Sequence, residues 1–290
     1  MNALSMAGER GASGRMSASR SWAVAARRNW REYAIEGAGL GLFMVSACAF
    51  GTLLEFPGSP LHVALPDPMT RRALMGLAMG LTAVALVYSP WGMRSGAHFN
   101  PALTLTFWRL GRVAGVDAAS YALSQFAGAL AGVAIMAAAI GPPLAAPPVR
   151  YVVTAPGPGG APAAFAAEAA ISALLMSAVL VVSNTPRVSR LTGAFAGALV
   201  ALFITFEAPI SGMSMNPARS AGSALFALHA PAQWIYFTAP PLGMLLAAEI
   251  YLRLRGPRAV FCAKLHHDNP EPCIFCEWRG ERPGGNRGKS

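Results

Sequence analysis

Six long apolar stretches dominate the pattern of hydrophobic and polar positions along this 290-residue chain. A helix that crosses a bilayer needs roughly 20 predominantly apolar residues. Each stretch has about this length and is bounded by charged residues, prolines or glycines, so the pattern predicts an all-helical membrane protein. The predicted spans are residues 33–54, 73–91, 118–140, 163–183, 191–210 and 232–252.

Polar segments divide the chain around these spans. The first 30 residues are rich in Ser, Ala, Gly and Arg, which predicts disorder and excludes the apolar core of a cleavable signal peptide. Two loops rich in proline, 55–70 and 141–162, lie between spans. The predicted organisation is a disordered basic tail over 1–31, a membrane domain over 32–252 with halves 32–140 and 163–252, and a polar tail over 253–290.

The distribution of charge predicts the orientation. Charged residues make up 12% of the chain, against about 25% in soluble domains. Most of the basic residues fall on one side of the six predicted spans, and the other side has only Arg71, Arg72 and Arg150, with Arg219 set apart. Because basic loops stay in the cytoplasm, we expect a protein of the cell membrane with both termini cytoplasmic. We then expect the basic residues behind the net charge of +10 to interact with anionic lipid rather than with nucleic acid.

The two halves of the chain repeat each other. The octapeptide SGAHFNPA over 95–102 matches SGMSMNPA over 211–218 at five of eight positions, and a glutamate lies early in the first span of each half. Three spans per half is an odd number, so the second copy must be inverted in the membrane. Inverted repeats place the functional site near the midplane, between discontinuous helices.

Each repeated motif reads as the start of a helix. Asn is a favoured N-cap and Pro is favoured at the first helical position. The segments that follow, 103–110 and 219–228, are too short to span, so we expect two half-helices whose N-termini meet inside the membrane. Each N-terminus carries roughly half a positive charge, which disfavours a cation but leaves amide hydrogens for the oxygen of water. The predicted pore residues are Asn100, Pro101, Ala102, Asn216, Pro217 and Ala218.

The segments SGAHFNPALTLTF and SGMSMNPARSAG resemble the two signature loops of the aquaporin (major intrinsic protein) family, and the resemblance covers about residues 32–252. It implies six transmembrane helices plus two re-entrant half-helices in an inverted repeat, the aquaporin-like hourglass. It also implies a homotetramer with one pore per subunit, passive conduction and no cofactor for conduction. No nucleophile–base constellation or cofactor loop is evident, so an enzyme is not expected.

The resemblance also implies a selectivity filter at Arg219, Ile204, Met213 and either Met79 or Gly80. Ile204 falls where water-selective members usually have His, whereas Ser220-Ala221 after the arginine resembles the water branch. A water channel that excludes protons and ions is therefore the leading interpretation. A facilitator of small neutral solutes such as glycerol, urea or ammonia is the alternative.

Three polar residues within or beside the predicted spans admit two interpretations each. Glu36 and Glu168 are either ion-coupling carboxylates of a secondary transporter or structural acceptors that hold backbone amides of the re-entrant loops, and the resemblance favours the second. His98 is either a gate or a packed histidine with a satisfied ring. Among the other residues, Met75 is read as core filling and Tyr236 as an interfacial anchor.

The polar tail holds three of the four cysteines of the chain. Cys273 and Cys276 form a C-x-x-C pair, and Cys262 precedes it together with His266 or His267. Thiolate and imidazole are preferred zinc ligands, so this cluster is a candidate zinc site. A disordered tail with incidental cysteines, or a redox-reactive cysteine pair, are the alternatives.

Overall fold

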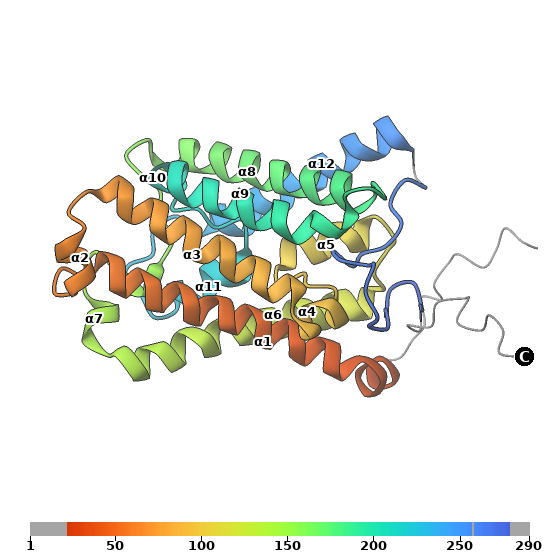
Figure 1. The fold of residues 1–290 in the computed structure, drawn as a ribbon, viewed down its shortest axis with the longest axis horizontal. Coiled ribbons are helices and arrows are strands. Elements are labelled where there is room, and N and C mark those ends of the chain that lie inside the picture. Colours follow the sequence, from red (N-terminus) through yellow and green to blue (C-terminus); the bar gives the residue numbers. More distant parts are fainter. Residues whose placement is uncertain (1–21, 257, 279–290) are drawn as a thin grey trace, which may run out of the picture.

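The computed structural model describes residues 22–256 and 258–278, and these ranges contain helices and no strands (Figure 1). Six of the described helices are long and apolar enough to cross a membrane, α9 together with the short 3-10 turn before it. They are α1 (Trp22–Glu55), α3 (Pro68–Tyr88), α6 (Gly115–Ile140), α8 (Gly160–Ser183), α9 (Thr192–Phe206) and α12 (Trp234–Arg255).

Shorter helices connect the long ones or enter the bundle from its ends. Two of them, α5 and α11, begin at the prolines of the Asn-Pro motifs inside the bundle and are too short to cross it. The short helices are α2 (Pro60–Ala64), α4 (Pro90–Ser95), α5 (Pro101–Arg109), α7 (Pro142–Ala145), η1 (Arg150–Val152), η2 (Ser189–Leu191), α10 (Ala208–Ser211) and α11 (Pro217–Ala224). The predicted fold of six spans and two half-helices is confirmed.

The bundle is built from pairs of helices that repeat between the halves. α1 packs along α6 in the first half, α8 packs along α12 in the second, and α3 packs against α9 across the two halves. The half-helices cross over, since α11 contacts α6 and α5 contacts α12. Each half therefore helps to hold the re-entrant segment of the other half.

Glycines allow the paired helices to approach closely. A Cβ added at Gly128 of α6 would lie 1.9 Å from the carbonyl oxygen of Gly37 in α1, and one at Gly132 would lie 2.4 Å from that of Gly41. Between α3 and α9, a Cβ at Gly80 would lie 2.6 Å from the carbonyl oxygen of Gly197. Small residues at such contacts are the usual basis of helix packing in lipid.

The first helix starts earlier than the sequence predicts. α1 begins at Trp22, so the prediction of disorder was wrong for residues 22–31. Tertiary contacts stabilise this extension, because the side-chain amide of Asn29 donates to Asp117 of α6 at 2.9 Å and Ala25 is buried. Residues 1–21 of the predicted disordered tail lie outside the described residues.

Two other helix boundaries differ from the predicted ones. The predicted span 73–91 ends instead at Tyr88, because Ser89 adopts an extended conformation before Pro90 and caps the separate helix α4. Proline disfavours the helical conformation of the residue before it. α11 ends at Ala224, four residues before the predicted end at 228.

Residues 258–278 pack across one end of the bundle, beside α4, α5 and the start of α1 (Figure 1). We call this segment the C-terminal loop and this end of the bundle the tail end; the opposite end is the far end. The C-terminal loop contains no helix, but it buries several side chains, and it is therefore a folded segment rather than a polar extension. The buried residues include Val260, Cys262, Ala263, Lys264, Leu265 and Cys273.

Candidate functional site: a cavity between two half-helices

The N-termini of α5 and α11 meet near the middle of the bundle, and each is capped by the asparagine of its motif. The side-chain oxygen of Asn100 accepts from the backbone amide of Ala102 at 2.9 Å. The side-chain oxygen of Asn216 accepts from Ala218 N at 3.1 Å and Arg219 N at 3.2 Å. Proline follows each asparagine at the first helical position, where a missing amide hydrogen costs no hydrogen bond.

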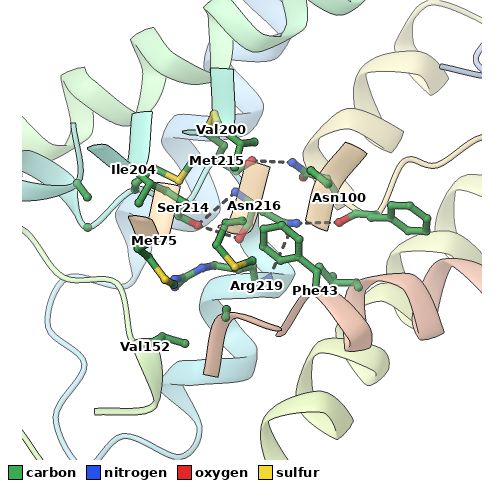
Figure 2. A pocket seen from close by; sticks show the side chains of 18 of the residues that line it. Phe43, Met75, Asn100, Val152, Val200, Ile204, Ser214, Met215, Asn216 and Arg219 are labelled. Carbon is green, nitrogen blue, oxygen red and sulfur yellow. Dashed lines mark hydrogen bonds between the residues drawn. The ribbon is translucent and has the colours of Figure 1, made fainter. Parts of the chain in front are cut away.

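The two asparagines also tie the repeats together. Asn100 Nδ2 donates to Met215 O at 2.7 Å, and Asn216 Nδ2 donates to Phe99 O at 2.8 Å (Figure 2). A side-chain amide has two N–H hydrogens, so each asparagine keeps one donor after this bond. Both residues line the central cavity, which places these two donors at its midpoint.

Each re-entrant loop is held by the glutamate of its own half. Glu36 accepts from His98 N at 3.0 Å and from Phe99 N at 2.6 Å. Glu168 accepts from Ser214 N at 2.6 Å and from Met215 N at 2.8 Å. Neither glutamate lines the cavity, and both are fully buried. These contacts are the ones expected if the two carboxylates hold the backbone amides of the re-entrant loops.

The loop backbones are strained in the same way in both halves. Ala97 and Phe99 have φ values of 58° and 45°, and the matching Met213 and Met215 have values of 50° and 55°. Left-handed conformations cost non-glycine residues of order 1–3 kcal/mol each and persist only where the surroundings enforce them. The carboxylate bonds to the amides of these loops supply that restraint, and the loops line the cavity.

The cavity has a volume of about 510 Å³ and runs through the bundle past both motifs. Its far-end lining includes Glu55 and Arg72, and its tail-end lining includes Val87, Val179 and Leu265. Most of the side chains along it are apolar, and the polar groups are few. Such a lining offers a small solute few hydrogen-bond partners along an otherwise apolar surface.

Arg219 places a charged side chain in the lining beside the second motif. It directly follows the second motif, and its Nη1 atom has no hydrogen-bond partner among the described residues. Met213 and Ile204 also line the cavity, and Met75 lies beside the Arg219 side chain in Figure 2. Met75 packs against the core, as the sequence predicts, and it also lines the cavity, which was not predicted from the sequence. It lies four residues, about one helical turn, before Met79, and this spacing is the signal that could have found it.

The choice between Met79 and Gly80 is decided by the rotation of α3. Met79 lines the cavity, whereas Gly80 faces α9 and packs on Gly197, so the assignment of Gly80 to the filter is wrong. Helix packing fixes this rotation, and the hydrophobic pattern of α3 does not report it.

Two buried tyrosines support the re-entrant loops. The sequence did not single out the first, Tyr121, and predicted a different role for the second, Tyr236. Tyr121 of α6 donates to Ser95 O at 2.6 Å, and the equivalent Tyr236 of α12 donates to Ser211 O. Tyr236 is fully buried, so its interpretation as an interfacial anchor is wrong. The two tyrosines occupy matching positions in the repeats, which is the signal that could have identified them.

The tail residues singled out in the sequence come together in the C-terminal loop. One ligand atom from each of Cys262, His267, Cys273 and Cys276 lies within 4.8 Å of the others, and His266 is outside this group. The ring of His266 instead contacts Tyr88, with centroids 5.2 Å apart. Hydrogen bonds with Cys262, Cys273 and His267 hold the pKa of the Cys276 thiol below its ordinary value.

Comparisons with known proteins agree with this architecture. The X-ray structure of the aquaglyceroporin from Plasmodium falciparum matches with a TM-score of 0.62 at 19% identity, over 79% of this chain and 98% of that one, which shows the fold. "Putative aquaporin NIP4-1" of Arabidopsis thaliana is 32% identical over 224 residues, 77% of this chain and 71% of the relative. "Aquaporin NIP1-4" of Oryza sativa subsp. japonica is 37% identical over 188 residues, 63% of this chain.

The chain spans 66%, 61% and 58% of the lengths of three rice relatives. The model of the family described as "Major intrinsic protein" matches residues 23–251. This range includes both half-helices and all six spans apart from Trp22 of α1 and the last turn of α12. Members of that family are channels rather than enzymes. With the capped half-helices, the paired asparagines and the cavity past both motifs in place, the chain is a member of the major intrinsic protein family of membrane channels.

Proposed function

We propose that this protein is a passive channel that conducts water and excludes protons and ions. The observation that carries the proposal is the meeting of two capped helix N-termini inside the cavity, with one free amide hydrogen on each of Asn100 and Asn216. A water molecule there can accept hydrogen bonds from both donors through its oxygen. Conduction in this proposal uses no cofactor.

Ion exclusion follows from the same geometry. Each helix N-terminus contributes roughly half a positive charge, so a cation at the midpoint faces about one positive charge in total. Arg219 adds a fixed positive charge to the lining toward the far end. A water whose oxygen is held by both asparagines has its hydrogens directed away from the midpoint, which interrupts the chain of hydrogen bonds that a proton would follow.

A second candidate function is the passage of small neutral solutes such as glycerol, urea or ammonia. The observation that favours it is the apolar surface of Met75, Ile204 and Met213, which line the same cavity as Arg219. A wall of this kind accepts the carbon backbone of a polyol while Arg219 donates to its hydroxyls. The same three side chains are bulky and leave little room for a polyol beside Arg219, and for this reason water remains the first choice.

Coupling to an ion gradient is disfavoured by the placement of the glutamates. A coupling carboxylate must be reached by the ion, but Glu36 and Glu168 lie outside the cavity and are occupied by backbone amides and by Ser95 and Ser211. Glu36 also accepts from the side-chain amide of Gln125 at 2.8 Å.

The proposal includes the membrane, the orientation and the oligomeric state of the channel. The basic residues gather at the tail end, so we place this end in the cytoplasm of a cell with the channel in the cell membrane. The exposed leucines and isoleucines along the outer faces of the helices fit lipid and neighbouring subunits. We infer a homotetramer with one pore in each subunit.

The deciding experiment is stopped-flow light scattering on proteoliposomes, first with an impermeant osmolyte and then with glycerol. We expect osmotic water permeability well above that of empty vesicles, unchanged when ion gradients are collapsed, and slow entry of glycerol. Glycerol entry as fast as water flow would favour the second candidate function, the passage of small neutral solutes. Solute flux that stops with the ion gradient would overturn the passive mechanism.

A further inference from the structure

The four side chains gathered in the C-terminal loop match a tetrahedral metal site. Cys262 Sγ lies 3.5 Å from Cys273 Sγ, and His267 Nε2 lies 3.0 Å from Cys276 Sγ. Zn–S bonds of about 2.3 Å in a tetrahedron place two thiolates about 3.8 Å apart, close to the spacing here. A disulfide needs about 2.05 Å between sulfurs, and all three cysteines are free.

The surrounding loop is organised around a buried lysine. Lys264 is 2% exposed, and its Nζ donates to Glu271 O at 2.9 Å, to Pro272 O at 3.3 Å and to Asn269 Oδ1 at 3.3 Å. These bonds fold the segment before Cys273 back toward Cys262. The ammonium also offsets the net negative charge of a zinc ion bound by three thiolates and one imidazole.

The C-terminal loop has little regular secondary structure of its own to keep it folded. It contains no helix or strand, and its backbone bonds are few, one of them from Cys273 N to Trp278 O at 2.8 Å. In small segments of this kind, metal binding supplies the folding free energy. The aromatic rings of Phe261 and Trp278 flank His267, at centroid distances of 5.1 and 5.8 Å, and restrict the position of its ring.

This loop is seated on the re-entrant loop of the first half. Leu265 N donates to Gly96 O at 3.1 Å, and the Nε2 atom of His98 bonds to Ala263 O at 2.8 Å. A carbonyl can only accept, so Nε2 carries the proton. The ring of Phe275 stacks on the ring of His98 with centroids 5.4 Å apart. His98 is therefore a docking point for the loop and lies two residues before Asn100.

A second set of contacts ties the same loop to the other half of the channel. Phe261 N donates to Asn184 Oδ1 at 2.6 Å, just after α8. Arg190 in η2 pairs with Asp268 at 2.5 Å, although both side chains are largely exposed and such pairs contribute little on their own. The C-terminal loop thus bridges the tail-end mouth of the cavity from one half to the other.

Leu265 occupies that mouth. It is 4% exposed and lines the cavity together with Leu103 of α5, Val87 of α3 and Val179 of α8. An apolar side chain enclosed by apolar walls leaves a passing water no hydrogen-bond partner, and hydrophobic constrictions of this kind close channels by excluding water.

We propose that Cys262, His267, Cys273 and Cys276 bind one Zn²⁺ ion and that the metal-held loop is a plug that closes the tail-end mouth with Leu265. Loss of the metal loosens the loop, withdraws Leu265 and opens the pore. The plug depends on the proposed channel function, whereas the metal site does not. The ion lies outside the path of the solute and takes no part in conduction.

The metal site is tested by elemental analysis of the full-length protein purified without chelator. We expect one zinc per chain, lost in the double variant Cys273→Ser/Cys276→Ser and retained in Cys48→Ala, which removes the cysteine outside the tail. His266→Ala is the matched control for His267→Ala, and only the second should weaken zinc binding. A wild-type protein without zinc, or with a Cys262–Cys273 disulfide by mass spectrometry, would overturn the site.

The plug is tested by osmotic water permeability of the same proteins in vesicles, with zinc present and after chelation. We expect zinc-loaded wild-type protein to be severalfold less permeable than chelated protein, so the chelated form is the one that should reach the water permeability expected of the channel. The double cysteine variant should be open in both conditions. Leu265→Ala should be open while retaining its zinc, which separates the plug from the metal. Size-exclusion profiles and helical content identify any variant that has not folded.

The outcomes separate the two proposals. Equal permeability of zinc-loaded and chelated protein, with Leu265→Ala no faster, would overturn the plug and leave the channel function standing. Permeability no greater than that of empty vesicles in every folded variant would count against the channel function itself.

Discussion

At the scale of single residues, Asn100 and Asn216 combine three tasks that no other residue type performs together. The side-chain oxygen caps a helix, one amide hydrogen ties the opposite loop, and the other amide hydrogen faces the cavity. Aspartate could cap the helix but would place an anion at the midpoint. Serine could cap the helix but has no second donor to offer.

Replacing Asn216 with Asp should therefore weaken the exclusion of cations. One negative charge offsets the two half-charges of the helix ends. It also sets a carboxylate against Phe99 O, which accepts from Asn216 at present, at a cost of about 1–3 kcal/mol in stability. Planar-bilayer recordings should show a cation conductance that wild type lacks. Asn216→Ser keeps the cap without the charge and should stay closed to cations; equal conductance in the two variants would refute the electrostatic account.

At the scale of elements, the approach of paired helices is set by glycines on both sides of each contact. The contact between α1 and α6 relies on Gly37 facing Gly128, with no room for a methyl group between them. This contact matters for the pore because α1 carries Glu36 and α6 carries Gln125 and Tyr121, all of which hold the first re-entrant loop.

The substitution Gly128→Ala should destabilise the protein by about 1–3 kcal/mol, as overpacking of a close contact usually does. The added Cβ would lie 1.9 Å from Gly37 O, which forces the two helices apart. Gly115→Ala in the same helix is the matched control, because its nearest neighbour would be 3.4 Å away and alanine favours helix. Thermal unfolding in detergent, followed by helical content, should show a lower midpoint for the first variant only.

At the scale of the whole molecule, one chain contains a complete cavity with both motifs, so the proposed pore needs no residue from a second chain. Large apolar side chains remain exposed on the outer faces of the long helices, among them Leu123, Ile135, Leu174 and Leu246. We therefore expect assembly to bury part of this surface without changing the path of the solute.

The tetramer is checked by native mass spectrometry of protein released from nanodiscs. In co-reconstituted mixtures of active and blocked subunits, permeability should fall in proportion to the blocked fraction, because each pore acts alone. A steep, cooperative fall would place the pore between subunits instead. A stable monomer with full permeability would remove the tetramer from the proposal.

The sequence by itself determined the six spans, the inverted repeat and the two capped half-helices. Hydrophobic length and Asn-Pro capping are local properties that act wherever such segments fold. Only the tertiary structure decided that Met79 rather than Gly80 faces the cavity, and that His267 rather than His266 joins the cysteines. Both choices depend on how an element is turned by its packing partners. The plug at Leu265 rests on contacts such as that between His98 and Ala263, 165 residues apart, and no local pattern in the sequence reports a pairing over that distance.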